Sequence, residues 1–167
     1  MRILRYAFLA VFLAGGLLLW GQLFSAETPQ QRALRIWNGM EVGMLSIESP
    51  DGGHREIEVR IADTSAERAQ GMQYIPPPQI RRFPIWFVFQ ETRTVGWHME
   101  NVRLPLEIAW VSANGRVVGV GRMEPGGTGY GTAEPIRYAL ETAAGNAQRL
   151  GIEPGARLRL SAGNTQE

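Results

Sequence analysis

The sequence contains no cysteine and no lysine among its 167 residues. The lack of cysteine excludes disulfide bonds, thiolate metal sites and a lipid attached through cysteine. Because lysine is absent, all 17 basic residues are arginines. Two of these arginines lie before residue 26 and all 16 acidic residues lie after it, so the rest of the chain has a net charge of −1. That balance predicts no basic face and argues against a nucleic-acid partner.

Charged side chains are also absent between residues 6 and 24. A helix of this length, at about 1.5 Å per residue, matches the roughly 30 Å hydrocarbon core of a bilayer. Arg2 and Arg5 precede the stretch, and positive charge on the cytoplasmic side directs the rest of the chain outward. Tyr6 and Trp20 lie near the two ends, where aromatic side chains favour the membrane interface.

We therefore expect residues 1–26 to be a single-pass transmembrane anchor in the cell inner membrane, with the C-terminal domain in the periplasm. Gly15 and Gly16 would allow a neighbouring helix to approach this anchor closely. The alternative is a cleaved signal peptide. Cleavage after Ala26 would place Phe24 at position −3, where small residues are usual, so we favour the retained anchor.

Helix and turn signals follow the anchor. Residues 27–40 form an amphipathic linker, in which Thr28 and Pro29 can begin a short helix. Residues 41–167 form the exported β-rich domain, in which Thr64 and Glu67 have the spacing of a capping box. Short alternating apolar runs in this domain surround turn signals at residues 50–53 and 114–115. We predict an α+β fold that is mostly β, a compact antiparallel curved or barrel-like sheet with two short helices, preceded by one transmembrane helix.

A series of short motifs occurs in a fixed order between residues 56 and 160. They are Ala62-Asp63-Thr64, Glu67-Arg68 with Gly71, Phe87-Val88-Phe89, Met99 with Asn101, residues 105–109 (PLEIA), Gly115 with Val117-Val118, Met123 with Pro125, Arg137-Tyr138, Leu140-Glu141, and Gly145 with Ile152 and Gly155. This order resembles the bacterial and archaeal family called domain of unknown function 192. The resemblance implies a compact β-rich fold, commonly exported or membrane-anchored, and supplies no activity. His98, Glu100 and Gln73 depart from the usual residues of that family.

His98 and Glu100 would lie on one face of a strand. Such a pair can supply two metal ligands, or an imidazole oriented by an acid for base catalysis. A metal site needs three or four converging ligands, and His54, the only other histidine, lies in a hairpin turn. We therefore expect no metal and no cofactor, and a partly exposed pair that is a weak candidate for contact with a ligand or partner.

Two further polar residues, Asn101 and Glu107, flank Pro105. We expect their side chains to bond to backbone groups that the proline interruption leaves unpaired, with ligand contact as the alternative. Tyr130 lies in a glycine-rich loop, which can cover a cleft or contact a partner. Three tryptophans, Trp86, Trp97 and Trp110, are expected in the core, with a sugar-binding face as the alternative.

These features together favour a non-catalytic role. We expect a membrane-anchored accessory or interaction subunit whose exported domain docks on a larger integral-membrane complex, such as a respiratory or photosynthetic assembly. The expected partners are the membrane and other integral-membrane subunits. The alternatives are an envelope ligand-binding module for a glycan and a hydrolase that uses the His98 region.

Overall fold

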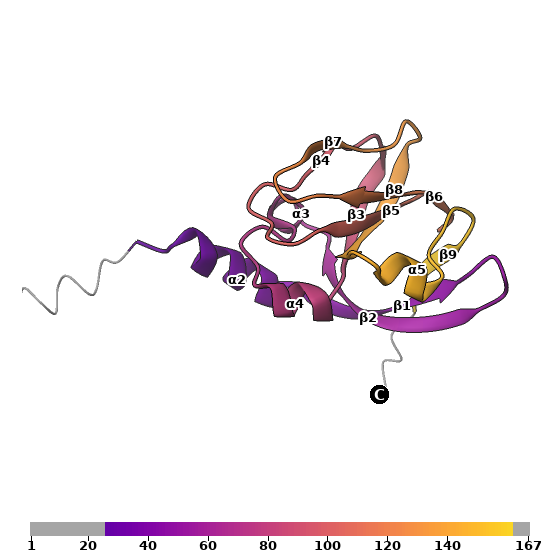
Figure 1. Cartoon of the computed structure of the whole chain (residues 1–167), viewed down its shortest axis with the longest axis horizontal. Helices are drawn as coiled ribbons and strands as arrows, with labels where there is room; N and C mark the ends of the chain where they lie inside the picture. Colours follow the sequence, from indigo (N-terminus) through magenta and orange to yellow (C-terminus); the bar gives the residue numbers. More distant parts are fainter. Residues whose placement is uncertain (1–25, 162–167) are drawn as a thin grey trace, which may run out of the picture.

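The computed structural model describes residues 26–161, and Figure 1 shows their arrangement. The helices and strands of this range are α2 (Pro29–Gly39), β1 (Glu41–Glu48), β2 (His54–Ala62), α3 (Ser65–Gln70), α4 (Pro77–Arg82), β3 (Ile85–Arg93), β4 (Trp97–His98), β5 (Leu106–Val111), β6 (Val117–Met123), β7 (Thr128–Tyr130), β8 (Ile136–Ala143), α5 (Asn146–Leu150) and β9 (Arg157–Leu160).

The strands form one large sheet and one small sheet. The large sheet has seven strands in the order β6-β5-β8-β3-β2-β1-β9, and β4 pairs with β7 in the small one. Hairpins join β1 to β2 and β5 to β6, as the turn signals predict. The two outermost strands of the large sheet also approach each other, because the Val117 amide donates to the Ala156 carbonyl at 2.8 Å and Arg116 bridges to Arg157. The large sheet is therefore curled toward closure.

The fold-class prediction was wrong in several respects. The domain is mostly β with short helices, but it has two sheets and, between residues 26 and 161, four helices where two were expected. The sheet is not wholly antiparallel either. β2 and β3 run parallel because α3 and α4 carry the chain back between them.

The predicted transmembrane helix is also not part of the described fold. Between residues 26 and 161, no helix is long and apolar enough to cross a membrane. The predicted anchor residues, Tyr6, Gly15, Gly16 and Trp20, lie outside the described residues.

The predicted linker contains a helix that packs on the domain. Thr28 and Gln31 form a capping box at the start of α2, with the Gln31 amide 3.2 Å from the Thr28 hydroxyl. Ala33 and Trp37 on one side of α2 are buried. The Arg60 guanidinium of β2 lies 5.1 Å from the Trp37 ring centroid and donates a 2.7 Å hydrogen bond to the Trp37 carbonyl. This helix is therefore held against the sheet.

Alternate residues of the central strands enter two separate apolar clusters. One cluster joins Ile85 and Ile108 to α2 and α4, and the other joins Trp86 and Leu140 to α5. On β8, Ala139 and Ala143 belong to the first cluster, and the residue between them on that face is Glu141. An ionisable side chain therefore lies where the pattern calls for an apolar one.

Candidate functional site

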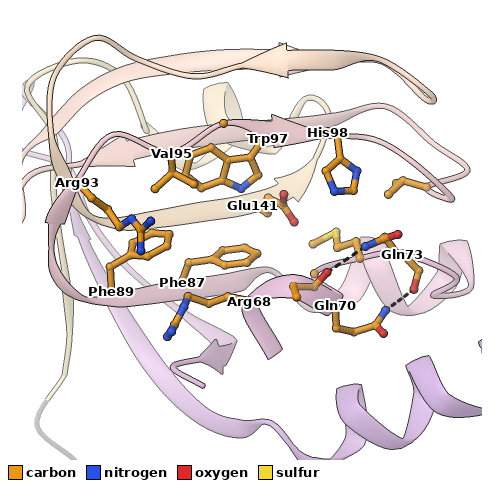
Figure 2. A pocket seen from close by; sticks show the side chains of 15 residues that line it. Arg68, Gln70, Gln73, Phe87, Phe89, Arg93, Val95, Trp97, His98 and Glu141 are labelled. Carbon is orange, nitrogen blue, oxygen red and sulfur yellow. Dashed lines mark hydrogen bonds between the residues drawn. The ribbon is translucent and has the colours of Figure 1, made fainter. Parts of the chain in front are cut away.

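A cavity of about 300 Å³ opens beside this glutamate. Its lining comes from α3 and the turn that follows it, from β3 and β4, and from Glu141 of β8 (Figure 2). This volume is at the lower end of the range for small-molecule sites, which are commonly about 300–1,000 Å³. The size suits a small compound better than a polymer segment.

Glu141 is the most unusual residue in the cavity. Its strand neighbours are Ile85 and Ile108, and its side chain is only 5% exposed. The carboxyl oxygen Oε2 is buried and has no hydrogen-bond partner. Burial raises the pKa of Glu141 to about 8, so the carboxyl group is protonated and neutral at pH 7. A buried polar atom without a partner is rare and requires an explanation.

Three aromatic rings form the apolar part of the cavity. Phe87 and Phe89 on β3 meet Trp97 on β4 edge to face, with ring centroids 6.4 and 6.2 Å from the tryptophan. Figure 2 shows the Glu141 carboxyl in the space between Trp97 and Phe87. These rings keep water from the carboxyl group, which is the physical cause of its raised pKa.

Two arginines line the cavity on the Phe89 side. Arg68 of α3 is fixed by hydrogen bonds to the Val88 carbonyl at 2.9 Å and to the Asp63 carbonyl, and its guanidinium lies 5.7 Å from the Phe89 centroid. Arg93, at the end of β3, is exposed and lies beside Phe89 in Figure 2. In the described part of the chain, neither arginine forms an ion pair. This side of the cavity is therefore cationic.

Comparison with known families agrees with the motif order. The family model described as "Uncharacterized ACR, COG1430" (DUF192) matches residues 47–160. The chain belongs to the DUF192 family. Every residue that lines the cavity lies within the matched segment, whereas α2 lies outside it.

Two crystal structures resemble this DUF192 domain. One is a proposed transcription regulator from Sinorhizobium meliloti 1021, with 28% identity and a TM-score of 0.67, and the similarity covers 72% of this chain and 95% of that one. The other is a protein of unknown function from Novosphingobium aromaticivorans DSM 12444, with 26% identity and a TM-score of 0.66, covering 72% of this chain and 86% of that one. No curated protein matches the chain.

Of the site residues predicted from the sequence, only His98 lines the cavity of the DUF192 domain. Its Nδ1 accepts a hydrogen bond from the Glu100 amide at 3.3 Å, so the neutral ring carries its proton on Nε2. The Glu100 carboxylate lies 4.0 Å from Nδ1 and is 74% exposed. Among residues 26–161, no three potential ligands gather to hold a metal ion.

Asn101 lies beside the cavity rather than in its lining. Its backbone is left-handed, with φ of 59°, and its carbonyl accepts the Tyr74 amide at 2.9 Å. The Asn101 side chain donates to Gln73 Oε1 at 3.3 Å, and Gln73 lines the cavity. Asn101 therefore connects the turn after α3 to the turn after β4, instead of bonding beside Pro105.

Glu107 and Tyr130 form hydrogen bonds that stabilise the fold and do not line the cavity. Glu107 of β5 accepts the Ala147 amide at 2.8 Å and so completes the first turn of α5. The Tyr130 hydroxyl accepts the Glu124 amide at 3.0 Å, and its ring occupies the space beside Gly127. Two backbone hydrogen bonds join the same glycine-rich loop to Met99. The Met99 amide donates to the Gly127 carbonyl at 2.7 Å, and the Gly126 amide donates to the Met99 carbonyl at 3.0 Å.

Sequence reasoning missed Glu141, Arg68 and Arg93. The available signal for Glu141 was a single acid in the strand-like run 136–143, on the face that Ala139 and Ala143 share. Arg68 and Glu141 also belong to the motifs Glu67-Arg68 and Leu140-Glu141, whereas nothing distinguishes Arg93 from the other arginines among the 17 in the sequence.

Proposed function

We propose that this protein is a binding module for a small polar molecule, which it holds in the Glu141 cavity. The observation that supports the proposal is the buried Oε2 of Glu141, which lacks a hydrogen-bond partner at the edge of a 300 Å³ space. An unsatisfied buried polar atom costs about 1–3 kcal/mol. A ligand that bonds to this oxygen recovers that free energy, which favours binding at this position.

Binding is better supported than hydrolysis. Within the described residues, the cavity lining contains no hydroxyl, thiol or amine that would serve as a nucleophile. His98 is bonded to the Glu100 amide and has no hydrogen bond to Glu141. The pair that base catalysis requires is therefore not assembled.

A small ligand is also better supported than a glycan chain. Trp86 stacks on Tyr138 at 5.2 Å in the cluster on the opposite face of the sheet. Trp110 is buried against Gly119 and Gly121. Only Trp97 of the three tryptophans lines the cavity, so they do not form one aromatic platform.

The accessory-subunit role, its integral-membrane partners and the periplasmic location stay predictions. They depend on the predicted anchor rather than on the cavity. A ligand-binding domain and an accessory subunit are compatible, since the cavity occupies only one part of the surface.

The test is a screen of small polar compounds by thermal unfolding of the full-length protein, followed by titration calorimetry. We expect a compound that ionises Glu141 on binding and loses at least about tenfold in affinity with Glu141→Gln, because a hydrogen bond to a charged group contributes about 1.5–3 kcal/mol. Glu134→Gln, an exposed acid outside the cavity lining, is the matched control. Equal affinity for all three proteins would contradict binding in this cavity.

A further inference from the structure

The acid and the two arginines lie at different places in the cavity lining. The Glu141 carboxyl lies between Trp97 and Phe87 in the middle of the cavity, with Arg93 and Phe89 on one side of it and His98, Gln70 and Gln73 on the other (Figure 2). Arg68 lies toward Phe89, on the same side as Arg93. Among the described residues, no ion pair joins Glu141 to Arg68 or Arg93. Glu141 and the two arginines do not neutralise each other, so each can bind a different group of a ligand.

The arginine end selects an anion. Three of the hydrogen bonds that Arg68 donates go to its own surroundings, including the Ser65 hydroxyl at 3.3 Å, so its position is fixed and its charge remains unpaired. The Arg93 side chain is exposed and forms no ion pair with another described residue, which leaves its planar guanidinium available. A guanidinium group binds a carboxylate through two parallel N–H···O hydrogen bonds.

The glutamate end suits a hydrogen-bond donor when the carboxyl group ionises, because an ionised carboxylate only accepts hydrogen bonds. Oε2 has no hydrogen-bond partner, and the rings of Phe87 and Trp97 lie beside the carboxyl group (Figure 2). An ammonium group has three N–H donors, and aromatic faces also attract cations. A charge-assisted bond between ammonium and carboxylate is roughly twice as strong as a neutral hydrogen bond. An ammonium group on the ligand would therefore interact favourably with both the Glu141 carboxylate and the aromatic rings beside it.

We infer that the ligand is a linear zwitterion, an aminoalkanoic acid whose ammonium group pairs with Glu141 and whose carboxylate pairs with Arg93 beside Arg68. This inference rests on the proposed function, since it names the class of compound that the same cavity takes. The aliphatic part of the ligand lies along Phe87, Phe89 and Trp97, and the small cavity limits its length.

Binding of this ligand releases a proton at pH 7. The Glu141 carboxyl is protonated in the empty cavity because burial raises its pKa to about 8, and it must ionise to pair with the ammonium group. The other charged or titratable groups of the lining are Arg68, Arg93 and His98, and Glu91 lies with the two arginines on the adjacent groove. The neighbouring residues on β3 and β5, Ile85 and Ile108, do not titrate. Affinity for the zwitterion therefore rises as the pH approaches 8.

The experiment uses the full-length protein and a series of linear aminoalkanoic acids of increasing length, from glycine to 5-aminopentanoate. Each member is paired with the hydroxy acid of the same length. We expect one amino acid to bind at least about tenfold more tightly than its hydroxy partner. Calorimetry in two buffers of different ionisation enthalpy should show release of about one proton with the amino acid and none with the hydroxy acid.

Two variants test the contacts of the ammonium group and of the carboxylate separately, and a third is a control. Glu141→Gln should abolish the preference for the amino acid while it still binds the hydroxy acid. Arg93→Gln should weaken both members of the pair by a similar factor. Glu134→Gln, an exposed acid outside the lining, should leave both affinities unchanged.

Two results overturn the inference. Equal affinity for the amino and hydroxy acids, or binding of the amino acid without proton release, shows that the ligand has no ammonium group at Glu141. In that case, a compound from the wider screen that requires Glu141 would still support the proposed binding function. If neither the series nor the wider screen yields a compound whose affinity depends on Glu141, both the inference and the proposed function fail. The buffer comparison uses wild-type protein, so it decides the question even if a variant does not fold.

Discussion

Gly71, which ends α3, faces the carboxyl group of Glu141 across the cavity. A Cβ atom added to Gly71 would lie 3.8 Å from Oε2 of Glu141 and 3.8 Å from the Phe87 ring. Gly71 also has φ of 47° and ψ of −134°, a region that other residues rarely adopt. The residue that ends the helix therefore also keeps open the space in front of the buried acid.

Gly71→Ala should destabilise the domain and weaken ligand binding. The backbone strain costs about 1–3 kcal/mol, and the methyl group narrows the cavity. Chemical denaturation of the full-length protein measures the first effect, and titration with any compound found in the screen measures the second. Gly39→Ala is the control, because an added Cβ there meets nothing within 4 Å and the backbone is not left-handed. Equal effects of the two substitutions would contradict the role of Gly71.

Glu141 should make stability fall as pH rises. The folded state keeps a proton on this carboxyl up to a pKa of about 8, whereas the unfolded chain loses it near 4.5. Between these values the folded state binds one more proton than the unfolded state, so the free energy of unfolding falls by about 1.4 kcal/mol per pH unit. In urea denaturation between pH 5 and pH 8, the free energy of unfolding of the wild type should fall more steeply with pH than that of Glu141→Gln. Parallel pH profiles for the two proteins would show that the carboxyl group is not buried.

Arg60 should fasten α2 to the sheet. Its guanidinium lies between the rings of Trp37 and Phe83, at 5.1 and 5.3 Å from their centroids, and donates to the Trp37 carbonyl. Arg60→Ala removes these contacts and should cost about 1–3 kcal/mol. Faster hydrogen exchange confined to residues 29–39 would mark local release of the helix. Arg81→Ala, at an exposed position of α4, is the control, and equal exchange in both variants would contradict the prediction.

Asn101 should stabilise the domain through its backbone rather than through burial. Its side chain is exposed and its φ is 59°, a conformation that asparagine and glycine tolerate better than alanine. Asn101→Ala should therefore cost about 1–2 kcal/mol, while Asn101→Gly should recover most of the loss. Thermal unfolding of Asn101→Ala and Asn101→Gly, compared with the wild type, measures the two losses of stability. If glycine is as harmful as alanine, the bond to Gln73 provides the stabilisation instead.

The sequence alone determined the local structure of this protein. The caps at Thr28 and Thr64 and the hairpin turns at residues 50–53 and 114–115 are set by side chains within a few positions of one another. Motif order identified the DUF192 family for the same reason, since short motifs are read along the chain.

Only the tertiary structure decided which residues share a cavity. Gln73 and Asn101 are far apart in sequence but bonded, and the bond that Glu107 makes to Ala147 also depends on how strands pair across the sheet. The parallel pairing of β2 with β3 follows from the path of the chain through α3 and α4, which no local pattern specifies. Glu141 is an ordinary acid in the sequence. It becomes a buried acid because β3 and β5 pair on either side of it and because Phe87 and Trp97 exclude water from its carboxyl group.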